Sequence, residues 1–149
     1  MRPYKVYAIE AGVVIDHIPP KKALDVVNVL KAMEGDSVVT LGVNLESEKG
    51  NRKDVVKIER KELSREDLMK IALIAPKATV NIIKDHEVSE KLNIAVPLVF
   101  ENIIKCPNPN CITNKEIVES KFHTVSAQPL MIKCHFCERT FERDEVSLL

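Results

Sequence analysis

The sequence of 149 residues predicts an α+β protein with a larger N-terminal part and a smaller C-terminal part of a different kind. Two observations support this class: apolar residues alternate with a period of two in several stretches, and they recur at helical spacing in two others. A third observation divides the chain, because all four cysteines lie beyond residue 105, where no long helical stripe occurs. We therefore expect two domains, of residues 1–97 and 98–149.

The N-terminal domain is expected to begin with a strand and a helix. Lys5–Glu10 alternates and predicts the strand, which Gly12 interrupts before a loop or short extended segment that ends at Ile18. Pro20 suits the first turn of a helix, and Gly35 suits the left-handed residue that ends one. The apolar stripe of this predicted helix consists of Ala23, Val26, Val27, Leu30 and Met33.

Two strands, a second helix and a last strand are expected next. The strands are residues 37–45 and 53–59, and a helix follows from the Ser64–Asp67 cap to Pro76. Residues 78–84 predict the last strand, and residues 85–91 a polar turn or short hairpin. In each predicted strand, alternate residues lie on the same face of the sheet. In residues 37–45, one face carries Val39, Leu41, Val43 and Leu45. In residues 53–59, Val56 and Ile58 lie opposite Lys53, Val55 and Lys57, and in residues 78–84, Val80 and Ile82 lie opposite Thr79, Asn81 and Ile83.

The order strand, helix, strand, strand, helix, strand is that of the ferredoxin-like split βαβ arrangement. Such a domain has an antiparallel sheet with both helices on one face. The other face is then exposed and carries Lys53, Lys57 and Asn81.

The four cysteines predict a structural zinc site with one ion per chain. Cys106 and Cys111 form one close pair, Cys134 and Cys137 a second, and each pair supplies one edge of a tetrahedron of thiolates. His135 lies inside the second pair, but four thiolates already complete the coordination. A pair of disulfides or four free thiols is the alternative. About fifty residues give a marginal core, so the remainder is expected to be a small all-β domain that the metal stabilises.

Composition restricts the partners. Lysine and arginine together number 22, as do aspartate and glutamate, and a formal charge of zero argues against nucleic acid as a partner. Apolar runs stay well below the roughly 18 residues that a membrane-spanning helix needs. Met1–Glu10 lacks the apolar core of a signal peptide, so we expect a cytoplasmic protein with reduced thiols.

No catalytic constellation is present, and we do not expect an enzyme. The four histidines do not have metalloprotease or catalytic-triad spacing, and the four glycines cannot build a phosphate-binding loop. A nucleotide site would therefore depend on side chains. Asp16 and His17 are one candidate pair and Lys53 with Lys57 another, although solvated surface groups would look the same.

A zinc-ribbon module that binds nucleic acid is the competing hypothesis, since ribbons with two cysteine pairs often have that role. The zero net charge, the few aromatic residues and the acidic residues near the end of the chain disfavour it.

Four motifs occur in order along the chain. The first is IDHIP at residues 15–19, and the second is RKD at residues 52–54 followed by KIE at 57–59. The third is AP at residues 75–76 followed by ATVN at 78–81, and the fourth is CPN at residues 106–108 followed by CI at 111–112. Together with the following C-x2-C pair, they resemble the family of aspartate carbamoyltransferase regulatory chains. The resemblance covers nearly the whole chain. It implies a non-catalytic subunit with an N-terminal allosteric domain and a C-terminal zinc domain.

The resemblance also implies partners and site residues. The expected assembly has two catalytic trimers bridged by three regulatory dimers, with the N-terminal domains paired and the zinc domains bound to catalytic chains. The expected effectors are CTP, UTP and ATP. Asp16 would bind ribose, His17 and Lys91 the phosphates, and Lys57 the base and ribose. The remaining expected pocket residues are Val6, Ala8, Ile9, Lys53, Asn81, Ile83 and Val88.

Overall fold

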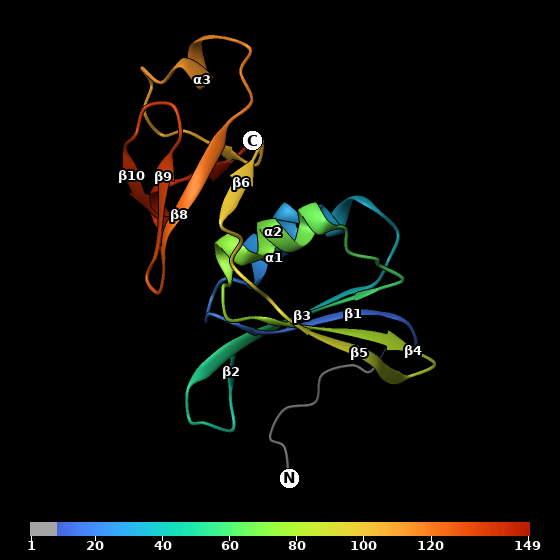
Figure 1. Cartoon of the computed structure of the whole chain (residues 1–149). Coiled ribbons are helices and arrows are strands. Elements are labelled where there is room, and N and C mark those ends of the chain that lie inside the picture. Colours follow the sequence, from blue (N-terminus) through green and yellow to red (C-terminus); the bar gives the residue numbers. More distant parts are fainter. Residues whose placement is uncertain (1–8) are drawn as a thin grey trace. The chain divides into compact units, whose positions relative to one another are not determined.

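The computed structural model describes residues 9–149, and the chain divides into two compact units, one ending at Ile94 and the other beginning at Ala95 (Figure 1). Each unit is described by itself. The predicted residues Val6 and Ala8, with most of the strand expected over Lys5–Glu10, lie outside the described residues. Of that expected strand, Ile9 and Glu10 are described, and neither belongs to a strand.

The N-terminal unit has the predicted ferredoxin-like arrangement with one additional strand. Its antiparallel sheet has the order β2-β3-β1-β4-β5, and α1 and α2 cover one face (Figure 1). The elements are β1 (Gly12–Ile18), α1 (Ala23–Val29), the 3₁₀ turn η1 (Ala32–Glu34), β2 (Val39–Glu46), β3 (Arg52–Glu59), α2 (Arg65–Ile74), β4 (Thr79–Lys84) and β5 (Glu87–Asn93).

The first strand begins where a break was expected, and Gly12 explains the difference. Gly12 starts β1 with a φ of 139°, and a Cβ there would lie 2.2 Å from the carbonyl oxygen of Ile58 on β3. The glycine therefore permits close approach of two central strands. Of the two alternatives for the segment to Ile18, a loop or a short extended segment, the extended one is confirmed.

The first helix is shorter than predicted. α1 ends at Val29, and the left-handed residue that follows is Lys31 (φ 53°), whereas Gly35 is extended with φ −103°. Met33 therefore falls on the separate turn η1, with its side chain 70% exposed. The rest of the predicted stripe is buried, as expected.

The expected apolar face of β2 is interrupted by a bulge. The register with β3 shifts between Gly42 and Leu45, where Asn44 is left-handed with a φ of 59°. The bulge changes the face of the residues that follow it, so Leu45 pairs with Lys53 on the open face, whereas Leu41 pairs with Val56 on the helix face. Val43, inside the bulge, is exposed, and so is Leu41 before it.

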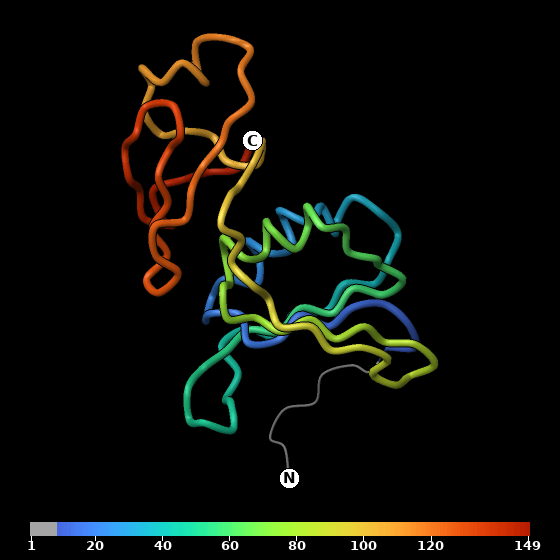
Figure 2. The backbone as a smooth tube through the Cα atoms, viewed as in Figure 1, coloured from blue at the N-terminus to red at the C-terminus, as the bar shows by residue number. Residues whose placement is uncertain are grey.

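The second helix and the following strands agree with the sequence. Ser64 and Asp67 form a reciprocal capping box at the start of α2. β4 then continues through a tight turn at Asp85–His86 into β5, which confirms the hairpin option (Figure 2). The buried core lies between the helices and the sheet and includes Ile15, Val26, Val56, Ile58, Ile71 and Val80.

The C-terminal unit is small and mostly β, as predicted. Its main sheet has the order β10-β9-β8-β6, and β11 pairs with β7. The elements are β6 (Val99–Glu101), β7 (Ile104–Lys105), α3 (Ile112–Lys115), β8 (Lys121–Ala127), β9 (Leu130–Cys134), β10 (Thr140–Glu142), the 3₁₀ turn η2 (Arg143–Glu145) and β11 (Ser147–Leu148). The fully buried side chains are few and include Phe100, Ile104, Phe122 and Ile132.

Candidate functional site

The four cysteines of the C-terminal unit converge on one point. Their sulfur atoms all lie within 4.8 Å of one another. The closest contacts join the two loops: 3.7 Å for Cys106–Cys137 and 3.7 Å for Cys111–Cys134. A tetrahedral zinc–sulfur distance of about 2.3 Å corresponds to a sulfur–sulfur edge of about 3.8 Å. The donor set and its spacing therefore fit one structural zinc ion.

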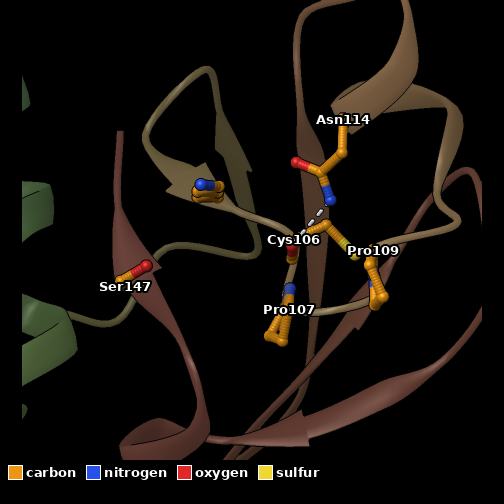
Figure 3. A pocket seen from close by; sticks show the side chains of 6 residues that line it. Cys106, Pro107, Pro109, Asn114 and Ser147 are labelled. Atoms are coloured by element: carbon orange, nitrogen blue, oxygen red, sulfur yellow. Dashed lines mark hydrogen bonds between the residues drawn. The ribbon is translucent and has the colours of Figure 1, made fainter.

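Hydrogen bonds shape the first cysteine loop. The side-chain amide of Asn114 donates to the carbonyl oxygens of Cys106 (2.9 Å) and Asn108 (2.7 Å), which holds the loop closed (Figure 3). The Thr113 hydroxyl donates to the sulfur of Cys111 at 3.1 Å. Such partners orient metal ligands.

The thiols differ in acidity. Burial raises the pKa of Cys106 above its ordinary value, which a backbone hydrogen bond from Asn108 only partly offsets. Burial also raises the pKa of Cys134. At Cys111 burial acts in the same direction, but hydrogen bonds from the side chain and backbone of Thr113 lower the pKa to about 7. Because metals bind thiolates, occupancy of the site displaces the remaining protons.

A pocket of about 400 Å³ lies beside the first cysteine loop (Figure 3). It is lined by Lys105, Cys106, Pro107, Pro109, Asn114 and Ser147. Because the pocket shares Cys106 with the thiol cluster, its shape depends on the same loop.

The face of the N-terminal sheet away from the helices carries a transverse row of polar side chains. Lys57 of β3 pairs with Val14 of β1, Val14 pairs with Asn81 of β4, and Asn81 pairs with Lys91 of β5. Val14 alternates with Val13 and Ile15, which lie in the helix-side core, so the row lies on the opposite face. Three of the predicted nucleotide-site residues are thus aligned across three strands.

A second group of predicted residues lies at the end of β1. The Lys53 ammonium lies 3.0 Å and 3.2 Å from the two carboxylate oxygens of Asp16, and both side chains are about one quarter exposed. The His17 backbone N–H donates to the same carboxylate at 2.6 Å. The His17 ring Nδ1 lies 3.1 Å from the Thr79 hydroxyl. Together these contacts present a cation, a carboxylate and an imidazole at one corner of the sheet.

Two family models match this chain. The model described as the allosteric domain of the aspartate carbamoyltransferase regulatory chain matches residues 4–95, and the model described as its metal-binding domain matches residues 99–147. The chain belongs to the family of aspartate carbamoyltransferase regulatory chains. The thiol cluster is accordingly the metal site of the second domain, and the prediction of one structural metal ion is confirmed.

Similar regulatory chains come from archaea. The chain is 51% identical to the aspartate carbamoyltransferase regulatory chain of Pyrococcus abyssi over 148 residues, with 98% of this chain and 97% of the relative covered. The identity to the Pyrococcus horikoshii chain is 53% over 145 residues, covering 95% of each. For Methanothermobacter thermautotrophicus it is 43% over 143 residues, covering 95% and 92%. These are regulatory rather than catalytic chains, as the sequence predicted.

The remaining predicted nucleotide-site residues of this regulatory chain are spread along the same sheet. Ile83 of β4 is buried and pairs with Val88 of β5, whose side chain is exposed. Ile9 is buried just before β1. The roles of these side chains, and of the other effector residues, stay predictions.

Two residues near Asp16 were not predicted to have a role. Thr79 contacts the His17 ring, and the buried Asp54 accepts backbone hydrogen bonds. Thr79 could have been found from the alternation of β4, which places it on the same face as Asn81. Asp54 gave no such signal, because a charged residue between Lys53 and Val55 looks like a solvated strand position.

None of the helices in residues 9–149 combines the length and apolar character needed to cross a membrane.

Proposed function

We propose that this chain is the adaptor through which nucleotides regulate the catalytic chain of aspartate carbamoyltransferase in the cytoplasm. Residues 1–97 bind CTP, UTP or ATP and pair with a second regulatory chain. Residues 98–149 dock on a catalytic chain, in an assembly of two catalytic trimers and three regulatory dimers. Family membership and the two domain matches support this assignment.

The observation that carries the effector site is the cationic surface opposite the helices. Lys57 and Lys91 lie in one row across the sheet, and Lys53 lies in the adjacent corner with Asp16. Ammonium groups spread over one face can contact several oxygens of an extended anion such as a triphosphate. In this assignment Asp16 accepts hydrogen bonds from ribose hydroxyls, His17 and Lys91 contact the phosphates, and Lys57 the base and ribose.

Exposed apolar side chains support the docking role of the zinc unit. Ile117 and Leu98 are almost fully exposed, and Val125, Ile112, Phe136 and Leu149 are also exposed. These side chains are available for burial against a partner, and burial of apolar area is the main favourable term in protein association. The metal would hold the loops that present these side chains, with no part in catalysis, because four thiolates leave no coordination position open.

Regulation then depends on differential binding. An effector shifts the catalytic trimers between two arrangements only to the extent that it binds the two arrangements with different affinity. Couplings of this kind are typically about 1–3 kcal/mol, so a modest rearrangement around Asp16 and Lys57 is sufficient.

Co-purification with the catalytic chain tests the assembly. We expect a complex on size exclusion and an activity toward aspartate that CTP and ATP change. A parallel titration with duplex DNA at physiological salt should show no binding. Separate elution of the two chains, or activity curves unaffected by every nucleotide, would contradict the proposal.

The substitution Lys57→Ala tests the site itself. It should abolish the response of the reconstituted complex to nucleotides and leave binding to the catalytic chain intact, because Lys57 lies outside the zinc unit that is proposed to dock there. Lys49→Ala, in the exposed turn between β2 and β3, is the matched control and should respond as the unmodified chain does. An unchanged effector curve for Lys57→Ala would remove this face of the sheet as the effector site.

A further inference from the structure

Asp54 is a buried carboxylate whose two oxygens serve different parts of the N-terminal unit. The residue is 0% exposed. Its Oδ2 accepts a hydrogen bond from the backbone N–H of Ala23 (2.9 Å), and its Oδ1 accepts one from the backbone N–H of Asn44 (2.7 Å). Through these two hydrogen bonds Asp54 joins α1 and β2 to the interior strand β3.

The position of Asp54 in the sheet is unusual because both neighbouring strands bulge beside it. On β1 the register passes from Ile15 opposite Val56 to Ile18 opposite Asp54, so that Asp16 and His17 together oppose a single residue. On β2 the register shifts between Gly42 and Leu45. Each bulge contains a left-handed residue with a φ of 59°, His17 on β1 and Asn44 on β2.

The hydrogen bond from the Ala23 N–H to Asp54 fixes the segment that follows Asp16 and His17. After Ile18 the backbone turns at Pro19, whose carbonyl accepts from Lys22 N–H, and Ala23 then starts α1. The N-cap residue of α1 is Lys22, and its side chain makes no capping hydrogen bond to the helix. The carboxylate of Asp54 supplies that acceptor from β3, so the segment from Asp16 to Ala23 is anchored where it ends.

Lys53 and Asp54 hold this segment from opposite faces. Adjacent residues of a strand point to opposite sides of the sheet. Lys53 contacts the Asp16 carboxylate on the open face, while Asp54 contacts Ala23 on the helix face. Lys53 therefore holds the Asp16–His17 bulge directly, and Asp54 anchors the chain that follows the bulge at Ala23.

We propose that Asp54 is a positioning residue of the effector site. It holds the Asp16–His17 bulge in its binding geometry and, through the same carboxylate, links that bulge to Asn44 on β2. Binding at the site then changes the environment of the Ala23 and Asn44 backbone amides through their hydrogen bonds to Asp54. This inference rests on the proposed binding of nucleotides at Asp16 and His17.

Asp54→Asn is the sharpest variant, because it keeps the shape of the side chain but replaces one of the two acceptors with an amide group. We expect the dissociation constant for CTP, measured by calorimetry on the full-length chain, to rise at least tenfold at a temperature where the variant is folded. Asp36→Asn, in the exposed segment before β2, is the matched control and should bind CTP as the unmodified chain does.

Hydrogen exchange separates positioning from a general loss of stability. In the unmodified chain, CTP should slow exchange of the Ala23 and Asn44 amides, and in Asp54→Asn this nucleotide-dependent slowing should disappear at one or both. Equal CTP affinity in the variant would overturn the inference. The inference would also be overturned if CTP slowed amide exchange at Asp16 and His17 of the unmodified chain but not at Ala23 or Asn44. This second result does not require the variant to fold. Failure of the unmodified chain to bind any nucleotide would instead refute the proposed effector site.

Discussion

The two units of this chain are stabilised in different ways. The N-terminal unit buries a continuous apolar core between two helices and a five-stranded sheet. In the C-terminal unit three of the buried side chains are the thiols of Cys106, Cys111 and Cys134. A unit of this size has a marginal core, and a bound metal supplies the missing free energy. The comparison predicts that metal removal and core substitutions act on separate halves of the molecule.

Metal removal should have the largest effect. Apparent zinc-binding free energies are on the order of 10 kcal/mol or more, comparable with the whole stability of a domain. A strong chelator should therefore unfold the C-terminal unit and leave the N-terminal unit folded. Limited proteolysis with circular dichroism would show this, and added zinc should restore the original pattern. A C-terminal unit that resists protease after complete metal loss would contradict the structural role.

Cys111→Ser should come next, because it removes one of four ligands and leaves an incomplete tetrahedron. We expect less than one zinc ion per chain by atomic absorption and loss of co-purification with the catalytic chain. The control is Asn110→Ser, an exposed neighbour that receives the same residue. Retention of the complex by the Cys111 variant would show that docking does not depend on the zinc unit.

Ile71→Ala tests the other half. Ile71 is fully buried on α2, and deletion of such a side chain costs about 2–5 kcal/mol. Urea unfolding should show that loss for the N-terminal unit, with unchanged zinc content. The exposed Leu24 of α1 provides the control, since Leu24→Ala should change the unfolding free energy by less than about 0.5 kcal/mol. Zinc loss in the Ile71 variant would mean that the two halves are not independent.

Ser64→Ala should have the smallest effect. It removes the side-chain acceptor of the capping box at the start of α2, which typically costs about 1 kcal/mol. Thermal unfolding of the N-terminal unit would detect the decrease. Ser89→Ala on the exposed strand β5 should leave the midpoint unchanged, and equal midpoints for the two variants would rule out a stabilising cap.

The zinc site and the ferredoxin-like order could be predicted because both depend on local spacing. Thiolate loops need two cysteines a few residues apart, and the period of the apolar residues follows directly from helix or strand geometry. The hairpin at Asp85–His86 and the Ser64 cap are also local features, and both were predicted.

The features that were missed depend on contacts between distant segments. Gly12 looked like a break because the sequence does not show that β3 passes close to it. The bulge at Asn44 places Leu45 on the face opposite to that of Leu41, and a regular period of two cannot reveal it. Asp54 is buried only because the N–H groups of Ala23 and Asn44 reach it across the fold. Each of these features results from tertiary contacts overriding a local pattern.

The close approach of β3 to Gly12 limits which amino acids position 12 can tolerate. Every other amino acid carries a Cβ, and at this position that atom would lie within 3 Å of backbone atoms of Ile58 and Glu59 on β3 and of Arg60, the next residue. Every substitution of Gly12 therefore introduces this clash, and alanine does so as much as tryptophan does. In a saturation library selected for nucleotide-regulated growth, position 12 should accept synonymous changes alone, while the solvent-facing Gly50, with no atom within 4 Å of its virtual Cβ, should accept at least asparagine.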